Sequence, residues 1–86
     1  MKRQPGSSKL KLIRIRSGWY KSADGMFEIE RGDPDEQPSW AGEWQLRAYE
    51  EWIETVPAKA DAVALAEKIL ADPVRMEFIR SRYGNR

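Results

Sequence analysis

The clearest hydrophobic pattern in the chain lies in residues 58–72, AKADAVALAEKILAD. At about 100° per residue, its larger apolar side chains fall in one arc roughly 160° wide, as in an amphipathic helix. Pro57 precedes the segment, where a missing N–H costs nothing, and Asp72-Pro73 ends it because a residue before proline leaves the α region. The pattern therefore predicts a helix that packs one face on a sheet. The residues of that face are Ala62, Val63, Leu65, Ala66, Ile69 and Leu70.

Apolar and polar positions alternate before this helix, and alternation predicts strands. In residues 10–16, LKLIRIR, Ile13 and Ile15 are expected on an apolar face and the arginines on a basic face. Residues 40–48 and 52–56 predict two further strands. The inward positions of residues 40–48 are Trp44, Leu46 and Ala48, and the outward ones are Glu43, Gln45 and Arg47.

A hairpin is predicted by Asp24-Gly25, which is a favoured two-residue turn. With these two residues as the loop, Tyr20 faces Ile29 across the hairpin. A three-residue loop would place Tyr20 opposite Glu28 and mix the two faces, so the shorter loop is preferred. The predicted hairpin has Tyr20, Phe27 and Ile29 on one face and Lys21, Glu28 and Glu30 on the other.

A second helix is predicted over residues 73–83, with Asp72 as its cap and Pro73 as its first residue. Its apolar side chains split into two groups, and a helix with two apolar faces needs two neighbours. We expect one neighbour to be the first helix and the other to be a second copy of the chain; the alternative is a short helix with one face partly exposed. The two groups are Val74 with Phe78, and Met76 with Ile79 and Tyr83.

Together these elements predict an α+β fold: an antiparallel sheet of three to four strands packed on one long helix, followed by a short C-terminal helix. Residues 1–9, MKRQPGSSK, predict a flexible basic arm, and residues 10–86 predict one small domain. No apolar run approaches the roughly 18 residues of a membrane span. The N-terminus lacks the apolar core of a signal peptide, so a cytoplasmic protein is expected.

The composition argues against most kinds of catalytic and metal site. The chain has no cysteine and no histidine, which excludes disulfides, thiolate metal sites and the commonest general base. No glycine-rich phosphate loop and no nucleophile beside a base is present. The acidic stretch of residues 32–36 lacks the spacing and the closing glutamate of a calcium loop. We therefore expect no catalytic site, no cofactor and no metal, and predict that the protein is not an enzyme.

The formal net charge of +1 hides an uneven distribution of charge. Residues 1–22 carry seven basic side chains and no acid, whereas residues 23–56 carry ten acids and two arginines. Residues 57–86 are weakly basic again. Basic ends favour a nucleic-acid backbone, and an acidic, aromatic middle favours a protein interface.

The stretches GWYKSADGMFEIE and VPAKADAVALAEKI resemble the arm-type DNA-binding domain of phage tyrosine integrases, a three-stranded sheet plus one helix. The resemblance covers residues 18–71 and implies DNA binding through the exposed sheet face. The composition, rich in Trp, Arg, Ala and acids, is also similar to that of short proteins of actinobacteria and their phages. The matching positions are Tyr20, Asp24, Gly25, Phe27 and Ile29 in the hairpin, and Val56, Lys59, Asp61 and Ala62 around the helix start, with Ala58 in place of the family's capping threonine.

The charges oppose that activity, because the predicted outward face carries Glu28, Glu30 and Glu43 against Lys21 and Arg47, and an acidic face repels phosphate. We therefore predict a non-enzymatic protein-interaction module, a phage or host regulatory or accessory factor. The alternative is nucleic-acid binding through the basic N-terminal strand and the C-terminal helix. The candidate protein-binding residues are Trp40, Glu43, Met76, Ile79 and Tyr83, and the candidate nucleic-acid-binding residues are Lys9, Lys11, Arg14, Arg16, Arg80 and Arg82.

Overall fold

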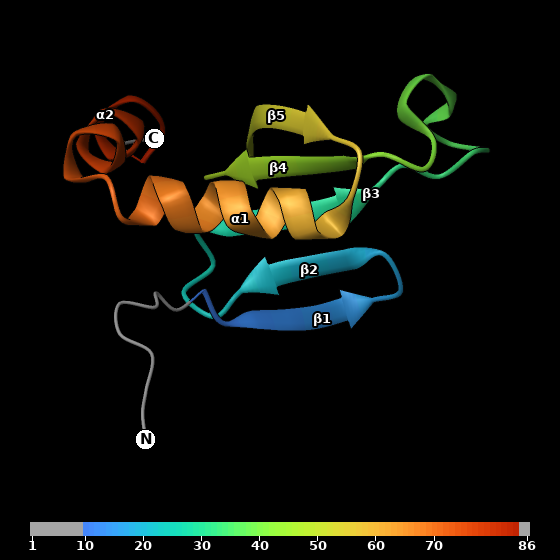
Figure 1. The fold of residues 1–86 in the computed structure, drawn as a ribbon, viewed down its shortest axis with the longest axis horizontal. Coiled ribbons are helices and arrows are strands. Elements are labelled where there is room, and N and C mark those ends of the chain that lie inside the picture. The colour runs from blue at the N-terminus through green and yellow to red at the C-terminus, as the bar shows by residue number, and fades with distance from the viewer. Residues whose placement is uncertain (1–9, 85–86) are drawn as a thin grey trace.

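In the part of the chain that the structure describes, five strands form a single antiparallel sheet and two helices follow it (Figure 1). The fold is that of a computed structural model, which describes residues 10–84. The strands β1 to β5 are Leu12–Arg16, Trp19–Ser22, Phe27–Arg31, Trp44–Ala48 and Glu51–Val56. A 3-10 turn, Pro38–Trp40, lies between β3 and β4, and the helices are α1, Lys59–Leu70, and α2, Pro73–Tyr83.

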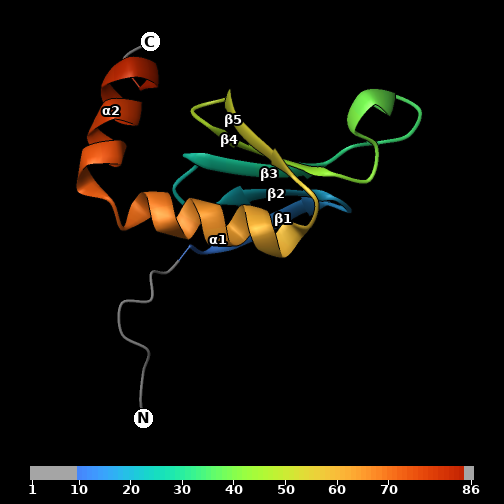
Figure 2. The ribbon, with the colours of Figure 1, turned by 45° about the horizontal axis from the view of Figure 1, so that its top comes forward.

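The strand order is β1-β2-β3-β4-β5, so each strand pairs with its neighbour in the sequence. Helix α1 crosses one face of this sheet, and Figure 2 shows that no helix of the described residues lies over the other face. Helix α2 turns away from the end of α1 and stands beside the β4–β5 end of the sheet (Figure 2). None of the helices within residues 10–84 is long and apolar enough to span a membrane.

The α+β class, the antiparallel sheet and the bounds of α2 are confirmed, but the predicted strand count and the contrast between one long and one short helix are wrong. The sheet has five strands instead of three to four, because all the segments with an alternating pattern pair into one meander. The two helices have 12 and 11 residues, so neither is long relative to the other. The predicted arm of residues 1–9 lies outside the described residues.

The core lies between α1 and the neighbouring strands β3 and β4. Phe27, Ile29 and Leu46 are fully buried on the sheet side. Ala62, Ala66 and Ile69 of the predicted apolar arc meet them from α1 and are also fully buried, while the other members of that arc are partly buried around them. Small alanines at the centre of the contact let the helix backbone approach the sheet closely.

The predicted hairpin register is confirmed, because Tyr20 pairs with Ile29 and Lys21 with Glu28. At the turn, the N–H of Gly25 donates to the Ser22 carbonyl at 2.8 Å, and Gly25 takes a φ of +80°. Such a φ favours glycine because it has no Cβ. The turn residues therefore match the conformation that the chain needs there.

The predicted facing of β1 is wrong. Ile13 pairs with Lys21, so it lies on the face that no helix covers, and its exposed fraction is 54%. Leu12, which the pattern did not single out, instead packs against the core. A β-bulge between Arg14 and Arg16 then changes the facing of the last residues of the strand, so a strict alternation cannot describe it.

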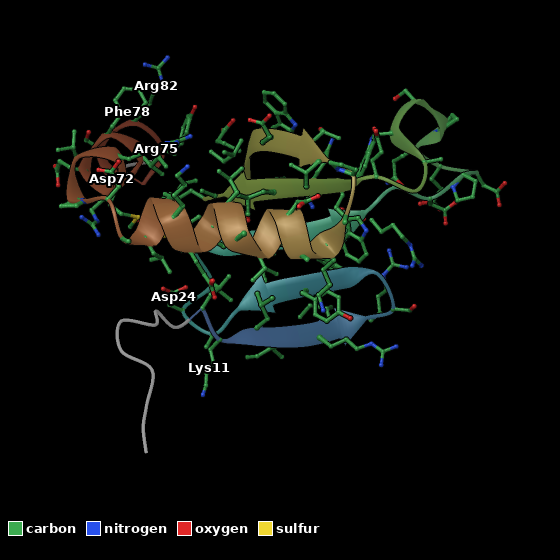
Figure 3. The ribbon with its side chains drawn as sticks, viewed as in Figure 1. Lys11, Asp24, Asp72, Arg75, Phe78 and Arg82 are labelled. Carbon is green, nitrogen blue, oxygen red and sulfur yellow. The ribbon has the colours of Figure 1, made fainter. Side chains whose placement is uncertain are left out.

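Helix α2 begins as predicted: the Asp72 carboxylate accepts hydrogen bonds from the N–H groups of Val74 and Arg75, at 3.1 and 3.2 Å. Its two apolar groups also separate. Met76 and Ile79 are buried, and Tyr83 is half-buried against the core. Val74 and Phe78 stay exposed, and Figure 3 shows Phe78 with Arg82 on the outer side of the helix.

Candidate functional site

The sheet face opposite α1 is left uncovered by the described residues, and we call it the open face (Figure 2). Strand pairing fixes its composition, because directly paired residues point to the same side of a sheet. Two rows of side chains cross all five strands. One row consists of Arg16, Trp19, Glu30, Gln45 and Thr55, and the next consists of Ile13, Lys21, Glu28, Arg47 and Trp52.

Arg47 is the centre of an ion-pair network on the open face. Its Nη2 donates to Glu30 Oε1 at 2.7 Å, and its Nε donates to Glu28 Oε1 at 3.5 Å. A third bond runs from Nη1 to Gln45 Oε1 at 3.3 Å. The side chains of Arg47, Glu28 and Glu30 are only 20%, 11% and 18% exposed. These charges are therefore held in place and shielded by their neighbours.

Trp19 completes the network from β2. Its indole Nε1 donates to Glu28 Oε2 at 2.8 Å, so both carboxylate oxygens of Glu28 are hydrogen-bonded. The guanidinium of Arg16 lies 5.6 Å from the centroid of the Trp19 ring, within the range of a cation–π contact. The indole is thus fixed between a carboxylate and a cation, which makes it a rigid part of the surface.

Two large apolar side chains stand at opposite sides of this network. Trp52 on β5 is 57% exposed, and its Nε1 donates to Thr55 Oγ1 at 3.0 Å. Ile13 on β1 is exposed to a similar degree, and Ile15 follows it in the same strand. Exposed aromatic and aliphatic groups around an ordered polar centre are a pattern typical of protein interfaces.

The open face is not acidic, which corrects the expectation from the sequence. Glu28 and Glu30 are paired with Arg47, and Glu43 precedes β4 and lies outside the paired rows. The strand β1 also contributes Arg16, which the sequence did not place on this face. Within residues 10–84, Arg16 and Lys21 make no ion pair, so these two cations remain available to a partner.

The structure divides the predicted protein-binding residues between two ends of the molecule. Trp40 and Glu43 come together in the β3–β4 connection, where the Glu43 N–H donates to the Trp40 carbonyl at 2.9 Å. Gly32 packs against them so closely that a Cβ there would lie 2.2 Å from the Trp40 carbonyl oxygen. Helix α2 lies at the far end of the molecule (Figure 1). Its predicted residues Met76 and Ile79 are buried against the core, and Tyr83 is half-buried beside them, so the three form no exposed apolar face.

The predicted nucleic-acid-binding residues are also separated. Lys11, Arg14 and Arg16 are exposed at β1, which is one edge of the sheet, and Lys9 lies outside the described residues. Arg80 and Arg82 belong to α2, which stands beside the β4–β5 end of the sheet, away from β1 (Figures 1 and 2). The two basic groups therefore form no continuous surface in the described part of the chain.

Sequence reasoning missed Trp19, Trp52 and Ile13 as members of one surface. For Trp19 the signal was present, because the predicted register already puts it on the same side as Lys21. For Trp52 the sequence carries no signal of which face the side chain lies on. Its facing depends on a bulge in the β4–β5 pairing between Leu46 and Arg47, which adjacent apolar residues do not reveal.

No family model, curated protein or solved structure matches this chain. Within residues 10–84, no group of three or more acidic side chains is arranged to hold a metal ion. The function is therefore inferred from the geometry of the open face. Its glutamates accept hydrogen bonds from Arg47 and Trp19, so the charged side chains at its centre are held in one arrangement.

Proposed function

We propose that this protein is a non-catalytic interaction module that binds a partner protein through its open face. One observation carries the proposal: Trp52 and Ile13 are exposed on an uncovered sheet, around charges that already pair with one another. Trp and Arg dominate the binding energy of protein interfaces. A role as a phage or host accessory factor fits a small module of this kind.

The charge balance of the open face favours a protein over a nucleic acid. Each phosphate contact needs a cation, and Arg47 is already engaged by two glutamates. Only Arg16 and Lys21 on this face lack a carboxylate within residues 10–84, and both belong to the β1–β2 side. The partner that complements the surface presents an apolar patch to Trp52 and Ile13 and carboxylates to these two cations.

The network also lowers the cost of binding. Ordering long charged side chains at an interface consumes part of the gross binding energy, about 0.5–1.5 kcal/mol for each one immobilised. Arg47, Glu28 and Glu30 are held before a partner arrives, because they bond to one another at 2.7 to 3.5 Å. A partner therefore meets a preorganised centre, and the side chains that it must still immobilise are Trp52, Arg16 and Lys21.

Two aromatic residues with the same exposed fraction provide a matched test. Trp52 on the open face and Phe78 on the outer side of α2 are both 57% exposed. We would immobilise the wild type, Trp52→Ala and Phe78→Ala chains and compare what each retains from a nuclease-treated lysate of the source organism. A discrete protein should be retained by the wild type and Phe78→Ala and lost by Trp52→Ala.

Two results would contradict the proposal. Equal retention by both variants would place the contact elsewhere than on the open face. Retention that disappears with nuclease and falls steeply as salt rises would instead show binding to nucleic acid, because counterion release makes such binding salt-dependent.

A further inference from the structure

A cavity of about 420 Å³, largely open to solvent, lies at the other side of the molecule from the open face, between the β2–β3 turn and the junction of α1 with α2. Its size falls in the range of roughly 300–1,000 Å³ typical of small-molecule sites. Figure 3 shows Asp24 below the C-terminal end of α1, next to this junction. The side chains that line it are Asp24, Met26, Tyr49, Leu70, Met76 and Arg80.

The floor of the cavity is apolar and adaptable. Met26 and Met76 are 8% and 9% exposed, and Leu70 is partly buried beside them. Thioether side chains are unbranched and polarisable, so they adjust to apolar groups of different shape. The floor therefore suits an aliphatic group without demanding one outline.

Two opposite charges line the same cavity without pairing. Asp24 and Arg80 make no ion pair with each other in the described chain. The two hydrogen bonds that Asp24 accepts, from the Ser22 hydroxyl at 2.6 Å and the Met26 N–H at 3.0 Å, both use Oδ1. Arg80 contacts Glu77 at 3.6 Å, and both side chains are well exposed, so that pair is weak. A carboxylate and a guanidinium are thus available to a ligand.

The wall formed by the β4–β5 turn is strained. Tyr49 and Glu50 have φ values of 53° and 68°, a region that side chains other than glycine and asparagine rarely adopt. The Tyr49 N–H donates to the Met26 carbonyl at 2.9 Å, which fixes the tyrosine at the edge of the cavity. The two-residue turn between paired Ala48 and Glu51 requires a positive φ at both positions, so the β4–β5 hairpin itself enforces this conformation.

We propose that this cavity binds a small zwitterion with an apolar side chain, of the chemical class of the free aliphatic α-amino acids. Its ammonium group pairs with Asp24, its carboxylate pairs with Arg80, and its side chain lies against Met26 and Met76. The site is independent of the open face, so it stands or falls separately from the partner interface.

The methionine methyl groups report on this site directly. The chain has three methionines, and two of them, Met26 and Met76, line the cavity. We would label the methyl groups with ¹³C and titrate the full chain with L-leucine. The resonances of Met26 and Met76 should shift with saturation, and that of Met1 should not move. Unchanged spectra, or three resonances that drift together without saturation, would overturn the proposal.

Two analogues and two variants test the charges. 3-Methylbutylamine lacks the carboxylate and 4-methylpentanoate lacks the ammonium group, and each should bind about fivefold more weakly than leucine, as expected for exposed ion pairs. Among the variants, Asp24→Asn keeps the oxygen that accepts from Ser22 and Met26 but removes the negative charge. Arg80→Gln removes the positive charge. Each should weaken leucine binding to a similar degree, and Phe78→Ala should not. Analogues that bind as tightly as leucine would exclude a zwitterion site.

Discussion

The two faces of the sheet are built from the same five strands, yet their side chains differ in burial and in charge. The covered face carries Phe27, Ile29 and Leu46, which are fully buried under α1. The open face carries a closed network of charges around Arg47 and an exposed tryptophan, Trp52. Alternation along each strand thus separates the residues that hold the fold from those on the surface that we propose meets a partner.

The largest expected effect is on the covered face. Leu46→Ala should lower the free energy of unfolding by about 2–5 kcal/mol, because it leaves a cavity in the core. Trp52→Ala should change it by less than about 0.5 kcal/mol, because the indole lies mostly in solvent. Urea denaturation of both variants measures the contrast. Comparable losses would show that Trp52 supports the fold and that the two faces are not separate in function.

A smaller loss is expected when the network on the open face is broken. Arg47→Ala leaves Glu30 without its cation and leaves Glu28 with only the hydrogen bond from Trp19. Loss of the partner of a largely buried charged group costs about 1–3 kcal/mol. Arg75→Ala serves as the control, because Arg75 is exposed and makes no ion pair within residues 10–84 (Figure 3). If the two variants unfolded at the same urea concentration, the network would contribute nothing to stability.

The helical layer depends on a cap that the open face does not touch. Asp72→Ala removes the acceptor of two N–H groups at the start of α2 and should cost about 0.5–2 kcal/mol. Asp72→Asn keeps an acceptor oxygen and should cost less. Circular dichroism during urea unfolding measures both. An equal loss in the two variants would show that the charge, and not the cap, is what matters.

The smallest effect concerns pH at the turn that joins β2 and β3. The Ser22 hydroxyl, and then the Met26 N–H, lower the pKa of Asp24 below its ordinary value of 3.8, although burial opposes them. A lowered pKa in the folded state adds stability above pH 3.8, and this stability is lost as pH falls through the folded pKa. Asp24→Asn should therefore show a weaker loss of stability than the wild type on acidification. Identical pH profiles would contradict the assignment.

Much of the fold could be predicted because local pattern and tertiary packing agree. The arc of α1, the Asp72 cap and the hairpin register of Tyr20 with Ile29 all follow from spacing and turn chemistry. The number of strands could not be predicted, because it depends on which extended segments pair with one another in the folded chain. The predicted facing of β1 was wrong because Leu10 and Leu12 alternate in the opposite phase to Ile13 and Ile15, and it is the two leucines that pack against the core. The bulge after Arg14 then breaks the alternation in the last residues of the strand.

The candidate site could be predicted only in part. The sequence places Glu28, Glu30 and Arg47 on one side, but it does not show that Arg47 neutralises both glutamates. That depends on distances between β3 and β4, which no spacing along the chain encodes. Met76 and Ile79 were expected at an interface because their spacing alone cannot tell a helix face that meets the core from one that meets a partner.

The most direct test of the proposed interface on the open face is site-specific photo-crosslinking in living cells. We would place a photo-reactive amino acid at position 52 or at position 78, where the native aromatic side chains are equally exposed, and irradiate cells of the source organism that express each chain. The account predicts a discrete protein adduct from position 52 and none from position 78. An adduct only from position 78, or crosslinks from position 52 to nucleic acid alone, would contradict it.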